Sequence, residues 1–223
     1  MDLSDFSPAS ALLTVVVLAL APFVAVMVTA FTKIVVVLSL LRNALGVQQI
    51  PPNVVLNGLA LILTIYVMYP VGHAMFRAVE GRGDVSGSTD AILAAAQSAK
   101  EPLRDFLLEH SNEREREFFL GTVRRLVDAS ERETGIDVDA IAARDFIVVI
   151  PAFTLSELTA AFQIGFLIFL PFIVIDLVIS NILMAMGMMM LSPTIVSLPF
   201  KLLLFVLIDG WTRLSHGLVL SYL

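Results

Sequence analysis

An almost unbroken apolar stretch from Phe146 to Pro193 constrains the fold more than any other part of the chain. As one straight helix, with a rise of about 1.5 Å per residue, it would reach about 70 Å, more than twice the hydrocarbon core of a bilayer. It also contains Glu157 and Asp176, and a carboxylate at mid-bilayer costs about 2.5 to 3.5 kcal/mol. We therefore expect the stretch to break, fold back or leave the lipid, with partner subunits completing its apolar surface.

The composition places the chain among integral membrane proteins. Of its 223 residues, 58% are hydrophobic and 15% are charged, and the mean hydropathy is +0.90. The net charge of −6 arises mainly between Arg77 and Asp145, where acidic residues outnumber basic ones. Because a nucleic-acid surface needs clustered positive charge, we expect no nucleic acid among the partners.

The patterns divide the chain into three parts. Residues 1–76 predict an apolar helical hairpin, in which Gly46 and a following Pro-Pro pair mark the connection and Pro22 kinks or interrupts the first helix. Residues 77–145 predict a polar, acidic helical domain, and residues 146–223 predict a second apolar hairpin with a methionine-rich loop. The predicted fold class is all-α: integral, membrane-associated helical hairpins with a helical polar insertion.

The charge distribution also predicts an orientation. Lys33 and Arg42 bracket the end of the first apolar run, so the positive-inside rule favours a cytoplasmic first connection. The polar domain and both termini would then face the periplasm of a bacterial inner membrane. The acidic start of the chain lacks the positive region of a signal peptide, so we expect the first apolar segment to be retained.

Small and weakly polar residues share one helix face early in the long apolar stretch. Such side chains let helix backbones approach closely and form hydrogen bonds across an interface, so we predict a subunit-packing surface. Glu157 lies beside this surface, either as a paired structural carboxylate or as a group that lines a water-filled path. The predicted packing residues are Ser156, Thr159, Ala160 and Gln163.

Three consecutive methionines, Met188, Met189 and Met190, follow Gly187 and precede Ser192-Pro193. In a helix they would point about 100° apart, so they suit a loop or a helix end better than a core stripe. Taken alone, they favour ordinary apolar filling near a helix end. The alternative is a dry constriction, formed when an adaptable methionine loop is repeated around an axis.

The sequence offers little support for enzyme chemistry. The three histidines are scattered, and neither a metal-binding HExxH motif nor a phosphate-binding GxxxxGK[ST] motif occurs. We therefore propose no catalytic residue, cofactor or metal. Two non-enzymatic functions stay open at this point: a proton-coupled small-molecule transporter using Glu157 and Asp176 as relay groups, and a purely structural assembly scaffold.

Several long segments resemble one known family in the same order along the chain. They are FTKIVVVLSLLRNALGVQQIPPN, PLRDFLLEH, PAFTLSELTAAFQIGF, PFIVIDLVISNILMAMGMMMLSP and LPFKLLLFVLIDGW. They resemble the FliP/SctR family, the export-gate subunit of flagellar and injectisome type III secretion systems. The acidic start and the LLRNALGVQQIPPN segment are more similar to the injectisome branch.

The resemblance implies a pseudo-helical ring of about five copies, completed by FliQ/SctS-like and FliR/SctT-like subunits. Unfolded substrate proteins would cross the inner membrane through this pore. By the same resemblance, Met188, Met189 and Met190 form a gasket around the closed pore, which reverses the preference drawn from the residues alone. Glu157 corresponds to a carboxylate associated with the channel in relatives.

Overall fold

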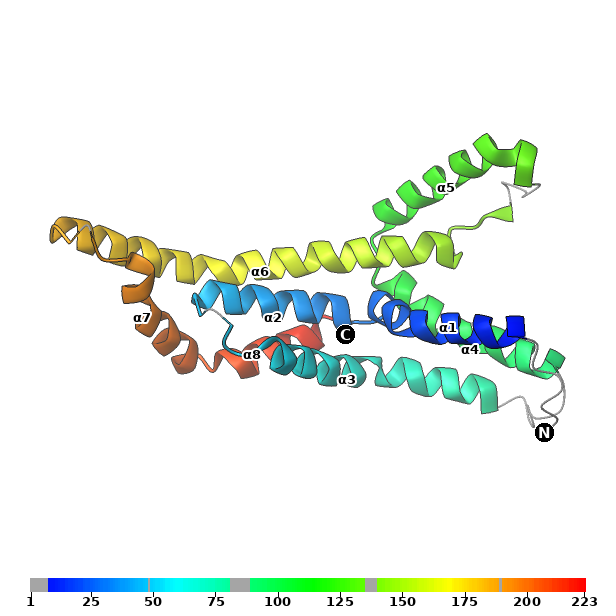
Figure 1. Cartoon of the computed structure of the whole chain (residues 1–223), viewed down its shortest axis with the longest axis horizontal. Helices are drawn as coiled ribbons and strands as arrows, with labels where there is room; N and C mark the ends of the chain where they lie inside the picture. Colours follow the sequence, from blue (N-terminus) through cyan, green and yellow to red (C-terminus); the bar gives the residue numbers. More distant parts are fainter. Residues whose placement is uncertain (1–7, 48, 81–88, 135–139, 189) are drawn as a thin grey trace.

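A computed structural model describes residues 8–47, 49–80, 89–134, 140–188 and 190–223, and these contain α-helices and no strand (Figure 1). The predicted all-α class is therefore confirmed. The helices are α1 Pro8–Met27, α2 Phe31–Leu45, α3 Asn53–Glu80, α4 Thr89–Glu109, α5 Glu113–Thr134, α6 Phe146–Ala185, α7 Pro193–Leu207 and α8 Gly210–Leu220.

Helix α6 is continuous for 40 residues and passes through Pro151 and Pro171. At a rise of about 1.5 Å per residue it is about 60 Å long. Of the three outcomes expected for this stretch, no break occurs as far as Ala185, and the chain folds back after that residue, before α7 begins at Pro193. A proline removes one backbone hydrogen bond, whereas ending the helix in apolar surroundings would leave several backbone groups unpaired, so the continuous helix is favoured.

The other helices are arranged around α6 (Figure 1). Helix α2 packs along α6, and α3 returns beside α2 after the connection that begins at Gly46, whose φ of 75° ends α2. Helix α4 packs on α3 and α6, whereas α5 packs on α6 and diverges from it toward its far end. Close contact between α2 and α6 depends on Gly165, because an added Cβ there would lie 2.2 Å from Cδ1 of Leu40.

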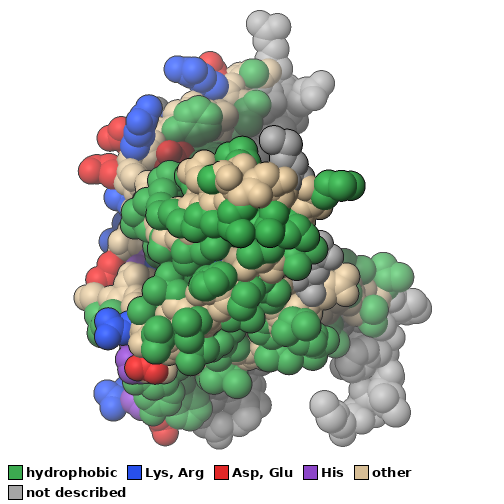
Figure 2. Space-filling model, turned by 90° about the vertical axis from the view of Figure 1, so that its left-hand side faces the viewer, with side chains coloured by type: hydrophobic (Ala, Val, Ile, Leu, Met, Phe, Trp, Pro, Cys, Tyr) green, Lys and Arg blue, Asp and Glu red, His purple; other side chains and the backbone are tan. Residues whose placement is uncertain are grey.

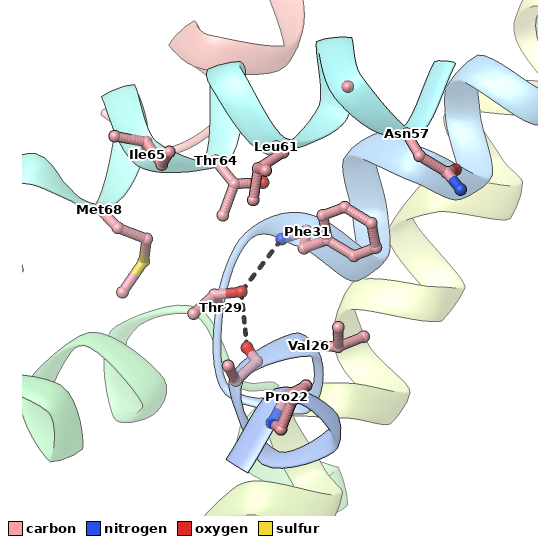
Figure 3. Close-up of a pocket in the computed structure, with 11 residues that line it drawn as sticks. Pro22, Val26, Thr29, Phe31, Asn57, Leu61, Thr64, Ile65 and Met68 are labelled. Atoms are coloured by element: carbon pink, nitrogen blue, oxygen red, sulfur yellow. Dashed lines mark hydrogen bonds between the residues drawn. The ribbon is translucent and has the colours of Figure 1, made fainter. Parts of the chain in front are cut away.

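The first apolar run is interrupted later than predicted. Helix α1 continues through Pro22 to Met27, and its last part, Leu18–Met27, meets α2 at an angle of 67°. At the break, the Thr29 hydroxyl donates to the carbonyl of Ala25 at 2.8 Å and accepts from the amide of Phe31 at 3.5 Å (Figure 3). These bonds satisfy backbone groups that the end of a helix leaves free, which explains why the chain bends here.

Much of the surface is apolar. Helices α3 and α6 are long and apolar enough to cross a membrane, and the bent pairs α1–α2 and α7–α8 raise the count to four if each pair is one span. Figure 2 shows the molecule from the end formed by α7 and the last part of α6. This end is mainly hydrophobic, with charged side chains near its margin. This surface fits a chain that lies in lipid or against other subunits.

Candidate functional site

Two ion pairs lie within the apolar body of the described structure. Lys33 of α2 contacts Glu157 of α6, with 3.1 Å between Nζ and Oε1. Lys201 of α7 contacts Asp176 of α6, with 2.7 Å between Nζ and Oδ2. Each pair therefore joins α6 to a different helix and neutralises charges that apolar surroundings would otherwise disfavour.

The first pair is almost completely buried, with side-chain exposures of 5% for Lys33 and 3% for Glu157. Lys33 lies in the first turn of α2, where the helix dipole disfavours a cation, and the Glu157 carboxylate offsets this unfavourable placement. The hydroxyl of Tyr222 donates a hydrogen bond to Oε2 of Glu157, and the Lys33 ammonium lies 3.6 Å from the Tyr222 ring centroid. We name these three residues the Glu157 cluster.

The Glu157 cluster keeps the Tyr222 phenol protonated. Burial, and then the neighbouring Glu157 carboxylate, raises the pKa of Tyr222 far above its ordinary value of 10.0. The neutral hydroxyl therefore remains a hydrogen-bond donor to the carboxylate.

This shift predicts a stability change at alkaline pH. Because the folded chain disfavours ionised Tyr222, the resulting stability is fully present below about pH 10 and is lost as the pH rises above that value. We expect the difference in melting temperature between wild type and Tyr222→Phe to shrink between pH 9 and 11, roughly across the titration range of a free phenol. Thermal denaturation of both proteins over this range measures the effect, and a constant difference would contradict it.

The second pair lies near the other end of α2. Ser197 donates to Oδ1 of Asp176 at 2.5 Å, and Lys201 also donates to the Ala44 carbonyl at 3.3 Å. Because Ala44 lies in the last turn of α2, the helix dipole there favours the Lys201 cation. Asp176 is 36% exposed at its side chain, so the carboxylate of this pair is better solvated than Glu157, although Lys201 is only 4% exposed.

The two carboxylates are far apart along α6. Glu157 and Asp176 lie nineteen positions apart on one continuous helix, which places them about 28 Å apart at the usual rise. Each has its own lysine at hydrogen-bond distance. This geometry does not support direct proton transfer between them, as the transporter hypothesis would require.

The methionine turn, residues 186–192, connects α6 to α7 at the end of the molecule remote from α4 and α5 (Figure 1). Gly187 adopts φ 71° and ends α6, and the amide of Met188 bonds to the Leu183 carbonyl at 2.9 Å. Met188 is 42% exposed and Met190 is fully exposed, whereas Met189 lies outside the described residues. The turn thus presents apolar side chains away from the chain's own core.

The predicted packing residues divide into inward and outward positions. The Ser156 hydroxyl accepts from the Asn112 amide at 2.8 Å, which ties the α4–α5 turn to α6 within the chain. Thr159 and Gln163 are exposed, and Ala160 is half-buried. A role for this face in subunit packing stays a prediction.

Sequence reasoning missed three residues that the structure places in ion-pair clusters: Lys33, Lys201 and Tyr222. A lysine within an apolar run does signal a need for a nearby carboxylate, so the two lysines could have been matched with the two acidic residues of α6. Tyr222 follows α8 and carries no such signal. Among the described residues, no group of three His, Cys, Asp or Glu side chains could hold a metal.

Comparisons with known proteins identify relatives along nearly the whole chain. The FliP family model matches residues 12–218. Yop proteins translocation protein R of Yersinia pestis is 52% identical over 92% of both chains. Pathogenicity-related ORF2 of Xanthomonas campestris pv. glycines is 51% identical over 95% of both. Hypersensitivity response secretion protein HrcR of Ralstonia nicotianae is 49% identical over 96% of this chain and 97% of the relative.

Proposed function

The chain belongs to the FliP family of type III secretion export components, of the injectisome type, and on this premise we propose that it is the pore-forming core subunit of an export gate. Unfolded protein substrates pass through the gate across the bacterial inner membrane. The chain's part is structural and mechanical, without catalysis or a cofactor.

The observation that carries this proposal is the methionine turn. Met188 and Met190 are exposed in the turn at the tip of the molecule. Apolar side chains gathered on an exposed surface usually mark a place that another protein or the membrane covers. Repeated around an axis, the turns would meet and exclude water from a closed pore. Methionine is unbranched and flexible, so such a seal can yield to a passing chain and close behind it.

The proposed assembly is a ring of about five copies, completed by FliQ/SctS-like and FliR/SctT-like subunits, in which neighbouring surfaces cover the apolar faces of α6. Support comes from the length of α6, which exceeds a bilayer, and from its exposed apolar side chains, including Phe162 and Phe166. Thr159 and Gln163 supply polar groups on the outer surface of the same helix. These features favour protein neighbours together with lipid.

We orient the chain with α4, α5 and both termini toward the periplasm. Of the two cations that suggested this orientation, Lys33 is buried in an ion pair, so the charge argument rests on Arg42. Arg42 donates to Oδ1 of Asn53 at 2.5 Å, across the first connection. That connection lies toward the same end as the methionine turn, opposite α4 and α5 (Figure 1), so both would face the cytoplasm.

Replacing Met188, Met189 and Met190 together by glycine should increase ion leakage through the closed gate, because the seal loses its apolar side chains. The measurement is the conductance of the complex in planar bilayers, after co-expression with its small membrane partners and extraction in detergent. Substitution of all three by leucine is the matched control, which preserves apolar volume and should preserve sealing.

The mass of each extracted complex is measured first, so that failed assembly is not mistaken for an open gate. Unchanged leakage in a correctly assembled glycine variant would contradict the seal and favour a purely structural scaffold. Such a scaffold would instead fail to assemble when Thr159 and Gln163 are replaced by bulky side chains, with sealing insensitive to the methionines.

A further inference from the structure

Within the Glu157 cluster, Tyr222 contacts three helices, α2, α4 and α6, and the break between α1 and α2. Its hydroxyl donates to Glu157 of α6 and lies 3.4 Å from the carbonyl of Ala30, at the break between α1 and α2. Its ring lies beneath the ammonium of Lys33 in α2. The ring also packs against Phe106 of α4 and against His110, just after that helix, with centroids 6.1 Å and 5.1 Å away.

Helix α8, which precedes Tyr222, has little buried surface of its own. Among its residues only Gly210 and Leu218 are buried, and Leu220 in its last turn is 63% exposed. Apolar burial on α8 comes mainly from Leu218, with Leu214 and Val219 packed half-buried beside it. A hydrogen bond from Tyr222 to a buried carboxylate adds to this packing, because bonds to charged groups are stronger than neutral ones.

The orientation of the Glu157 carboxylate also depends on the hydrogen bond from Tyr222. Lys33 occupies one carboxylate oxygen, and the Tyr222 hydroxyl occupies the other. A buried ion pair is stable only when its remaining hydrogen-bonding positions are satisfied. Tyr222 supplies that second bond from a segment 65 residues further along the chain.

We propose that Tyr222 is a positioning residue, which orients Glu157 toward Lys33 and fastens the α7–α8 arm, residues 193–222, onto α2 and α6. The arm is thus held at both ends by polar contacts to α6: near its start by Lys201 with Asp176, and at its end by Tyr222 with Glu157. This inference goes beyond the proposed export role and holds whether or not the methionine turn forms a seal.

The test is Tyr222→Phe in the full chain, which removes the hydroxyl and retains the ring over which Lys33 lies. Hydrogen exchange is measured by mass spectrometry on the detergent-extracted complex, at the amides of Ser221, Tyr222 and Leu223, which bond to carbonyls of the last turn of α8. We expect these amides to exchange roughly ten-fold faster or more, the size expected for a lost hydrogen bond to a charged group. Tyr66→Phe is the matched control, because Tyr66 is 69% exposed, and it should leave their exchange unchanged.

The same substitution in a variant that lacks the ion pair shows whether Tyr222 acts through its hydrogen bond to Glu157 or only through the packing of its ring. In Lys33→Met with Glu157→Leu, both charges are absent, so adding Tyr222→Phe should accelerate exchange by less than about two-fold. An equal acceleration in both backgrounds would show that Tyr222 acts through packing alone and would overturn the proposal. Wild-type exchange rates in Tyr222→Phe would overturn it as well.

Discussion

Replacing Glu157 by alanine is expected to destabilise the chain by about 3 to 5 kcal/mol, because the Lys33 ammonium would remain buried without its counter-ion. Both side chains of the pair are at most 5% exposed, so water cannot easily replace the lost carboxylate. The Tyr222 hydroxyl would lose its acceptor in the same substitution. Thermal unfolding of the detergent-extracted protein, followed by circular dichroism, measures the loss.

The matched control removes both charges together. Lys33→Met with Glu157→Leu leaves no unpaired charge, and such exchanges are often neutral or stabilising by about 1 to 4 kcal/mol. Asp176→Ala is a second comparison and should be milder than Glu157→Ala. Asp176 is partly exposed, and its partner Lys201 also donates to the Ala44 carbonyl. A loss for Glu157→Ala no larger than that for Asp176→Ala would contradict this account of the Glu157 cluster.

Replacing Gly210 by alanine is expected to cost about 1 to 3 kcal/mol through overpacking at the bend between α7 and α8. A Cβ at this position would lie 2.1, 2.3 and 2.6 Å from three ring atoms of Phe205. The ring is rigid and buried, and it packs edge-on against Trp211 with centroids 5.4 Å apart, so it cannot move aside freely. The preceding residue, Asp209, has a φ of 51°, which further restricts how the backbone can adjust.

Gly217→Ala is the control on the same helix. No atom lies within 4 Å of an added Cβ at Gly217, so the change should stabilise α8 by roughly 0.5 to 1 kcal/mol, the helix preference of alanine over glycine. Melting temperatures of the two variants should therefore move in opposite directions. Equal or reversed shifts would contradict the expected clash between an alanine side chain at position 210 and the Phe205 ring.

Local sequence signals were sufficient for the hairpin connection and insufficient for helix interruptions. Gly46 ends α2 as predicted, because a residue with positive φ is the usual end of a helix. Pro22 was a poor guide to interruption, since α1 continues through it, and α6 likewise continues through Pro151 and Pro171. The cost of a proline competes with the cost of exposing backbone groups in apolar surroundings, and a rule based on proline alone omits that second cost.

The sequence by itself determined the helical class, the membrane character and the family, because these follow from composition, apolar run length and long ordered motifs. For Glu157 it left two roles open, a paired structural carboxylate and a group that lines a water-filled path. Only the tertiary structure decided which residues pair with each charge. Lys33 and Glu157 are 124 positions apart, and Tyr222 contacts both from beyond α8. Such pairings depend on how each helix is rotated and on which helices lie side by side, and the spacing of residues along one helix contains neither quantity.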